Sequence, residues 1–327
     1  MSDTRTPMTA TVALRRRSPR VRNLTSHAGL VVVLLLLVVV TAIGSDVFFT
    51  APNVINVLRQ VSVLAVIAAG LTVLMISGGI DFSMGSNAIV TMAVVAQLIA
   101  AGVPSMFAVA AGVAIATVIG LVNGLIITLT RAAAFVVTLA TATLLDGLAL
   151  LVLDGLSVSA GEELSAFGSG GILGLPYLLI IAIVVMVVLG LTLKYTMFGR
   201  DAFAIGGNEA AARLSGIAVN ARKVALYALM GLLAGVAGVM LLGRLGAASP
   251  GVSGLTMELQ AVAAVVIGGT SLAGGKGTMT GTALGVLLLG VLANALNLLG
   301  VSSYLQIMAV GAVLLIAAIA NSWRGRR

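Results

Sequence analysis

The chain has 327 residues, of which 60% are hydrophobic and 9% are charged. Soluble domains are about 45–50% apolar and about 25% charged, so this composition excludes an ordinary soluble protein and predicts an integral membrane protein. The net charge is +8, there is no Cys, and the one His is His27. Disulfides and Cys-ligated metals are therefore excluded, and we expect no metal site. The basic residues flank apolar segments, which favours membrane lipid rather than nucleic acid as a partner.

Residues 1–28 form a basic segment that precedes the first long apolar run. Its arginines are Arg15, Arg16, Arg17, Arg20 and Arg22. A signal peptide is the alternative, but the basic region is long and the apolar run has no clean small-residue cleavage site. We interpret the segment as a cytoplasmic tail before a retained first helix.

Long unbroken apolar runs follow, and they predict an all-α fold rather than a barrel of alternating strands. A spanning helix needs about 20 mainly apolar residues. Ten such segments are expected, at 29–49, 60–77, 85–103, 106–130, 134–153, 176–194, 223–244, 258–273, 280–299 and 303–322. They make one transmembrane domain over 29–322, followed by a short basic tail at 323–327.

The distribution of Lys and Arg predicts the orientation. Ten spans with both termini in the cytoplasm place the basic tails and the loop 194–222 inside. The outer loops then hold mostly acidic residues, including Glu162 and Glu163. Arg59 and Arg244 lie near the outer face, and we interpret Arg244 as an interfacial anchor that can snorkel.

The inner loop 194–222 contains signals for a short helix. Asn208 suits the N-cap, Glu209 and Arg213 have the spacing of a helical ion pair, and Gly216 suits the end. A helix of about two turns is unstable alone in water, so it must pack on something. The residues leave two alternatives for this helix. It packs in a groove of another protein, or it packs on the membrane surface or on the chain's own bundle.

The same loop resembles a known family. FGRDAFAIGGNEAAARLSGI (198–217) is similar to the large cytoplasmic loop of ribose-type permeases of bacterial ATP-binding-cassette (ABC) sugar importers. Four other stretches match in the same order: SGGIDFSMGS (77–86), FVVTLATATLLDGLAL (135–150), ELQAVAAVVIGGTSLAGGKGT (258–278) and NALNLLGVSSYLQ (294–306). Each match alone is weak, but five in this order identify the family.

The resemblance implies that this loop carries a coupling helix that docks onto a separate ATPase. The residues carried over are Gly206, Gly207, Asn208, Glu209, Ala211, Ala212, Arg213, Ser215 and Gly216. It also implies a second permease subunit, identical or related, and an extracytoplasmic substrate-binding protein. The location implied is the bacterial cytoplasmic (inner) membrane, and the substrate a monosaccharide or related polyol.

The chain departs from the family pattern at four places. Ala133 and Ala134 stand where the family has two prolines, Asp146 where it usually has Arg, Gln260 where it has Asp, and Val310 where it has Lys or Arg. These changes predict a substrate or a partner contact that differs from those of the sugar-transporting members.

Polar residues within membrane spans are costly and are candidates for function. Asp81 is the foremost, because Gly78 and Gly79 can break the helix before it; the simpler alternative is that Asp81 or Ser83 caps the next helix. The gating or pathway candidates are Asp81, Ser83, Asn87, Thr138, Thr141, Asp146, Gln260 and Asn294. Packing between helices is the alternative role for the neutral ones.

Two other functions are weighed. An ion-gradient-driven secondary transporter would need ionisable groups near mid-membrane, for which Asp81 and Asp146 are the candidates. An enzyme would need a catalytic cluster that this composition lacks. The stretch 268–278 fails as a phosphate-binding loop, because Thr270 stands at the first Gly position and Gly277 follows Lys276. ATP and Mg are therefore expected on the partner ATPase, with no cofactor in this chain.

Overall fold

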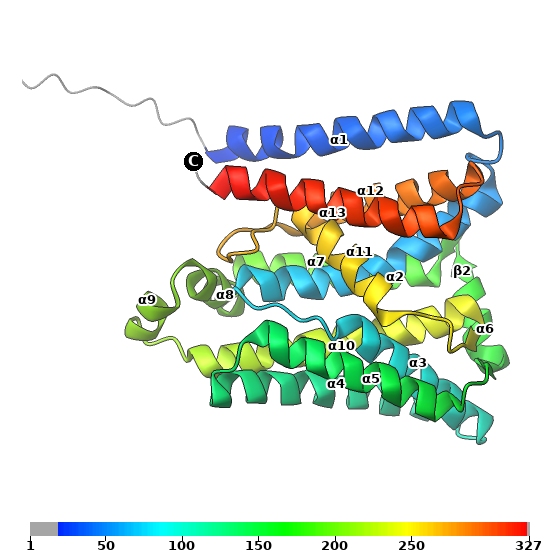
Figure 1. The fold of residues 1–327 in the computed structure, drawn as a ribbon, viewed down its shortest axis with the longest axis horizontal. Coiled ribbons are helices and arrows are strands. Elements are labelled where there is room, and N and C mark those ends of the chain that lie inside the picture. The colour runs from blue at the N-terminus through cyan, green and yellow to red at the C-terminus, as the bar shows by residue number, and fades with distance from the viewer. Residues whose placement is uncertain (1–18, 326–327) are drawn as a thin grey trace, which may run out of the picture.

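The computed structural model describes residues 19–325, which form a bundle of helices lying roughly side by side (Figure 1). Six helices in this region are long and apolar enough to cross a membrane: α2 (Ala51–Ile76), α4 (Ser105–Thr130), α5 (Ala134–Leu153), α7 (Tyr177–Tyr195), α10 (Val219–Leu245) and α12 (Met279–Leu298). Four more contain shorter apolar stretches: α1 (Pro19–Gly44), α3 (Met84–Ala100), α11 (Gly254–Ile267) and α13 (Ser303–Gly325). The all-α membrane fold is confirmed, and each of the ten expected segments corresponds to one of these helices.

The first two boundaries differ from the sequence expectation. α1 begins at Pro19 and ends at Gly44, so the expected span at 29–49 is shifted toward the N-terminus. α2 begins at Ala51 rather than near 60, because Thr50 is extended and a proline occupies the first turn. Of the expected tail at 1–28, residues 1–18 lie outside the described residues. The expected tail at 323–327 begins within α13, and 326–327 also lie outside.

α2 is the centre of the bundle. Every residue from 61 to 76 is buried, and the helix contacts α7, α10, α11 and α12. A helix that is apolar on all sides is stable only when other helices surround it. Any movement imposed on the end of α2 therefore reaches several helices at once.

α4 and α10 pack closely through small residues. A Cβ on Gly120 would lie 2.3 Å from the carbonyl oxygen of Tyr227, and one on Gly231 would lie 2.3 Å from that of Ala116. Small residues let backbones approach in this way in membrane helices, where packing rather than the hydrophobic effect drives association.

α3 and α11 begin slightly before the expected residues but end earlier, at Ala100 and Ile267, so both are shorter than the expected spans. A Cβ on Gly85 would lie 2.3 Å from the carbonyl oxygen of Gly254, so the two helix N-termini meet. The non-helical segment 77–83 leads from the end of α2 back to the start of α3 (Figure 1). Irregular backbone within a membrane protein is tolerated where protein surrounds it.

One end of the bundle carries short elements between the long helices. They are α6 (Gly161–Ser169), β1 (Val158–Ser159), β2 (Gly171–Ile172), β3 (Leu175–Pro176) and β4 (Ala247–Ala248). β1 pairs antiparallel with β4, and β2 with β3. The acidic Glu162 and Glu163 lie in the first turn of α6, where they complement the helix dipole.

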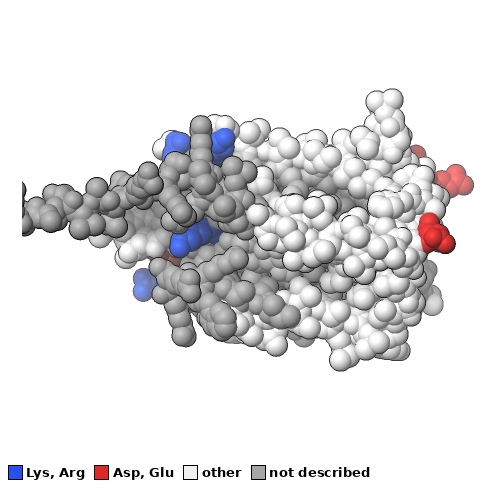
Figure 2. Space-filling model, turned by 90° about the horizontal axis from the view of Figure 1, so that it is seen from above, with Lys and Arg blue, Asp and Glu red and all other residues white. Residues whose placement is uncertain are grey.

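The opposite end carries α8 (Met197–Gly207) and α9 (Glu209–Leu214) (Figure 1). In the view of Figure 2, the described Lys and Arg side chains gather toward this end, whereas Asp and Glu stand out at the other. This separation agrees with the orientation expected from the positive-inside rule, in which α8 and α9 face the cytoplasm.

Candidate coupling and translocation site

The expected two-turn helix in the inner loop is a pair of helices. α9 is the helix expected from the sequence, while α8 precedes it and was not predicted. The Thr196 side chain caps α8 by accepting the N–H of Gly199. The Asn208 side chain caps α9 by accepting the N–H of Ala211 at 3.0 Å. Gly216, with φ of +84°, ends the unit in a conformation that only glycine adopts easily.

α9 has one packed face and one open face. Ala212 is buried against Ile205 and Val219, and this small cluster holds α9 on α8 and α10. Ala211 and Leu214 are exposed, and Leu214 keeps 91% of its surface accessible. An exposed Leu beside small alanines suits contact with another protein.

Charged groups tie α9 to the first turn of α10. Glu209 pairs with Arg213 at 2.8 Å and with Lys223 at 2.6 Å, and Arg213 also donates to Asn220 at 2.7 Å. The hydrogen bonds from Lys223 and Arg213 stabilise the carboxylate and lower the pKa of Glu209 below its ordinary value. These bonds hold α9 to the start of α10.

α8 touches the end of α2 through a glycine. A Cβ on Gly206 would lie 1.9 Å from the carbonyl oxygen of Ile76 and 2.6 Å from the nitrogen of Gly275. The N–H of Gly275 itself donates to that carbonyl at 2.8 Å. The ion pair of Asp201 with Arg222, at 2.7 Å, holds α8 to α10. The α8–α9 unit thus contacts both α10 and the central helix.

The segment 77–83 that follows α2 is held by a chain of polar bonds. Ser83 occupies the N-cap position of α3 but makes no side-chain capping bond. Asp81 instead accepts the Ser83 N–H at 2.7 Å and its hydroxyl at 2.6 Å. Asn123 donates to that hydroxyl at 2.9 Å and accepts from Thr141 at 2.7 Å. Ser83 therefore starts α3, as the capping alternative expected, but its side chain bonds to Asp81 and Asn123 rather than to the helix. Asp81 secures a turn that links α3, α4 and α5.

Two further bonds hold the same segment. Thr138 accepts the backbone N–H of Phe82 at 3.1 Å, and the Tyr227 hydroxyl donates to the carbonyl of Ile80 at 2.9 Å. Tyr227 belongs to α10, so the helix tied to α9 also touches the broken segment.

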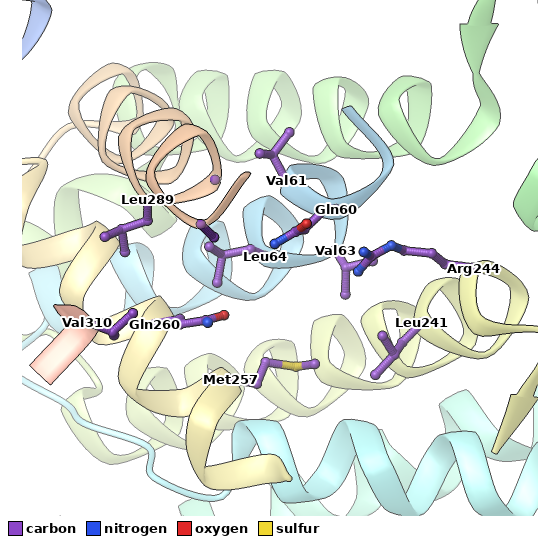
Figure 3. Close-up of a pocket in the computed structure, with 12 residues that line it drawn as sticks. Gln60, Val61, Val63, Leu64, Leu241, Arg244, Met257, Gln260, Leu289 and Val310 are labelled. Carbon is purple, nitrogen blue, oxygen red and sulfur yellow. The ribbon is translucent and has the colours of Figure 1, made fainter. Parts of the chain in front are cut away.

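The other pathway candidates lie apart from this network. Asn87 donates to the carbonyl of Ala116, and Asn294 exchanges two bonds with Asn53 at 2.8 and 3.1 Å. These bonds join neighbouring helices. Asp146 lines a cavity of about 90 Å³, and Gln260 lines a different one of about 100 Å³, shown in Figure 3.

Glu258 is a candidate that the sequence reading missed. It is 1% exposed and accepts both the N–H and the hydroxyl of Ser86 at 3.2 Å. It thereby joins α11 to the first turn of α3. The signal was available, since an acid within an expected span is itself a candidate for function.

Comparisons with known proteins agree with this architecture. Residues 53–318 match the family described as the permease component of the branched-chain amino acid transport system. The chain is 42% identical over 304 residues to the ribose import permease protein RbsC of Escherichia coli, covering 91% of this chain and 94% of the relative. It is 44% identical over 289 residues to RbsC of Bacillus subtilis, covering 88% and 89%.

The chain belongs to this permease family. The L-arabinose ABC transporter permease protein AraH of Azospirillum brasilense is another relative, 34% identical over 316 residues that cover 96% of this chain and 93% of the relative. No solved structure matches the chain. The permease family accounts for an all-α membrane bundle with an exposed loop that projects from one end.

Proposed function

We propose that this chain is the membrane-spanning permease subunit of an ABC importer for a monosaccharide or related polyol. It is a multi-pass protein of the bacterial cytoplasmic membrane. The observation that carries the proposal is the α8–α9 unit, which exposes Ala211 and Leu214 yet is tied by Glu209 to α10 and by Gly206 to α2. Such a unit can receive a force outside the membrane and pass it inward.

The named relatives supply the substrate class. They are ribose and L-arabinose permeases by name, and the five stretches that resemble ribose-type permeases extend over most of this chain. A hydroxylated substrate needs hydrogen-bonding groups when it leaves water. The polar residues on segment 77–83 and its neighbours are such groups.

The proposed mechanism moves the polar network through α8 and α9. When a partner ATPase closes on ATP and Mg, the exposed face of α9 follows it. Glu209 and Lys223 then shift the start of α10, while Gly206 shifts the end of α2. Both helices border segment 77–83, so Asp81 and Ser83 move with respect to Asn123. This movement opens the path alternately to the two sides of the membrane.

Other components complete the importer. A second permease subunit, identical or related, shares the path, and an extracytoplasmic binding protein delivers the substrate. Hydrolysis takes place in the ATPase, so this chain is not itself an enzyme. The alternative of an ion-driven transporter has less support, because Asp81 bonds to Ser83 while Asp146 lines a separate cavity.

The first prediction tests docking on α9. Ala211→Trp and Leu214→Asp change only exposed side chains, so we expect both variants to insert normally and to lose the ATPase. Leu214→Asp places a charge where an apolar contact forms, which costs about 1–3 kcal/mol or more of binding. The measurement is the amount of ATPase that co-purifies with the tagged chain from membranes that contain the whole importer.

Leu173→Asp is the matched control. Leu173 is 97% exposed but lies in the turn between β2 and β3, at the opposite end of the bundle. Its variant should retain the ATPase. Wild-type co-purification by both α9 variants would contradict the docking role.

A further inference from the structure

A cavity of about 100 Å³ lies among α2, α10, α11, α12 and α13. Its wall is mostly apolar, with Val63, Met257 and Val310 among the lining residues. Three polar side chains also line it: Gln60 from α2, Arg244 from α10 and Gln260 from α11 (Figure 3). They come from three helices and extend toward the same space.

Within the described residues, these three polar side chains have no bonding partner in the protein. Throughout residues 19–325, no hydrogen bond joins the side chain of Gln60, Arg244 or Gln260 to another protein group, and Arg244 has no ion pair. Arg244 was expected to act as an interfacial anchor, but Figure 3 shows its guanidinium directed toward Gln60 along the cavity. Two amides and a guanidinium are left free to bind a ligand.

The charge of the cavity selects the kind of ligand. Arg244 is the one ionisable residue among those that line it. Arg244 is partly buried in a mostly apolar wall, so a guanidinium without a partner is costly there, and a bound anion offsets that cost. The planar guanidinium also matches a carboxylate with two parallel bonds. Gln60 and Gln260 both donate and accept, which suits neighbouring hydroxyl groups.

The size of the cavity limits how much of a ligand it holds. A cavity of about 150 Å³ in another protein binds benzene, so about 100 Å³ has room for a group somewhat smaller than that ring. This volume fits the end of a small molecule rather than a whole sugar.

We propose that this cavity is a subsite for the anionic end of a polyhydroxylated acid, a sugar acid in chemical class. The carboxylate binds Arg244, and the adjoining hydroxyl groups bind Gln60 and Gln260. The inference rests on the proposed function, because it narrows the hydroxylated substrate to one that carries a negative charge.

Direct binding to the purified full-length chain in lipid nanodiscs tests this subsite. The probes are D-ribonate, D-ribose and ribitol, which have the same number of carbons and differ at the end that enters the subsite. We expect D-ribonate to bind on the order of tenfold more tightly than the other two, because a charge-assisted bond is about twice as strong as a neutral one. Calorimetry at low salt measures the three affinities.

Substitutions of the lining residues test whether the preference for D-ribonate depends on them. Arg244→Met should remove it, and Gln260→Asp should remove it because a second carboxylate in the same cavity repels the bound one. Arg244→Lys should keep part of the preference for D-ribonate, since the positive charge remains while the two parallel N–H donors of the guanidinium are lost. Arg131→Met is the control, because Arg131 ends α4 outside this cavity. If Arg244→Met does not fold, the affinities of Gln260→Asp for the three probes still test the subsite.

Equal affinity for the three probes, no binding by any of them, or a ribonate preference that survives Gln260→Asp would overturn the inference. Failure here is separate from failure of the proposed function. The ATPase co-purification reports on α9 at the other end of the bundle and does not depend on the ligand.

Discussion

At the scale of single residues, Glu209 is the group that fastens α9 to the bundle. Its carboxylate accepts bonds from Lys223 and Arg213, and these bonds lower its pKa. A lowered pKa in the folded state means that the ionised form stabilises the attachment. That stabilisation is present above the unfolded pKa and is lost as the pH falls through the folded one. Glu209 is partly exposed, so solvent screening keeps the effect small.

A spin label on α9 can detect this attachment. The chain has no Cys, so Ser215→Cys gives one labelling site at the end of α9. We expect the label to be restrained at neutral pH and to become more mobile below about pH 4.5, the ordinary pKa of Glu. In Glu209→Gln the label should already be mobile at neutral pH and should change little as the pH falls. Equal mobility in both proteins across this range would contradict the fastening role.

At the scale of elements, the contact between α8 and α2 allows a sharp comparison. Gly206 and Gly207 are neighbours, but only Gly206 lacks room for a side chain. Gly206→Ala must push α8 away from Ile76, and such overpacking costs about 1–3 kcal/mol. We expect this variant to bind the ATPase, because α9 is unchanged, yet to transport poorly for each ATP hydrolysed.

Gly207→Ala is the matched control, since no atom lies within 4 Å of the added Cβ. Its transport should match that of the wild type. The measurement is the ratio of substrate imported to ATP hydrolysed in proteoliposomes that contain the whole importer. A normal ratio for Gly206→Ala would show that α8 does not transmit force through the end of α2.

The elements also show how far the sequence alone could lead. Apolar runs predicted every long helix, because length and hydropathy depend only on local residues. The cap at Asn208 and the pair of Glu209 with Arg213 were equally local. The bonds of Ser83 with Asn123 and of Glu258 with Ser86 were not foreseen, because they join helices far apart in the chain. The cavity of Arg244 depends on five helices, so no pattern along the chain could indicate it.

At the scale of the whole molecule, the uneven distribution of charge sets the orientation. On the face that Figure 2 shows, Lys and Arg gather toward the end that carries α8 and α9, while Asp and Glu stand out at the other end. Positive residues are retained on the cytoplasmic side during insertion. The proposed function requires the same orientation, because an ATPase can reach α9 only from the cytoplasm.

Labelling of single cysteines tests this orientation without interference, since the wild-type chain has none. Ser215→Cys marks the α9 end, and Leu173→Cys marks the end with β2 and β3. In intact spheroplasts, a membrane-impermeant maleimide should label the cysteine at 173 and not the one at 215. After the membrane is permeabilised, both should react, because both positions are exposed in the fold. The reverse pattern would place α9 outside the cell, where no ATPase could bind it, and would rule out the proposed coupling mechanism whatever the chain transports.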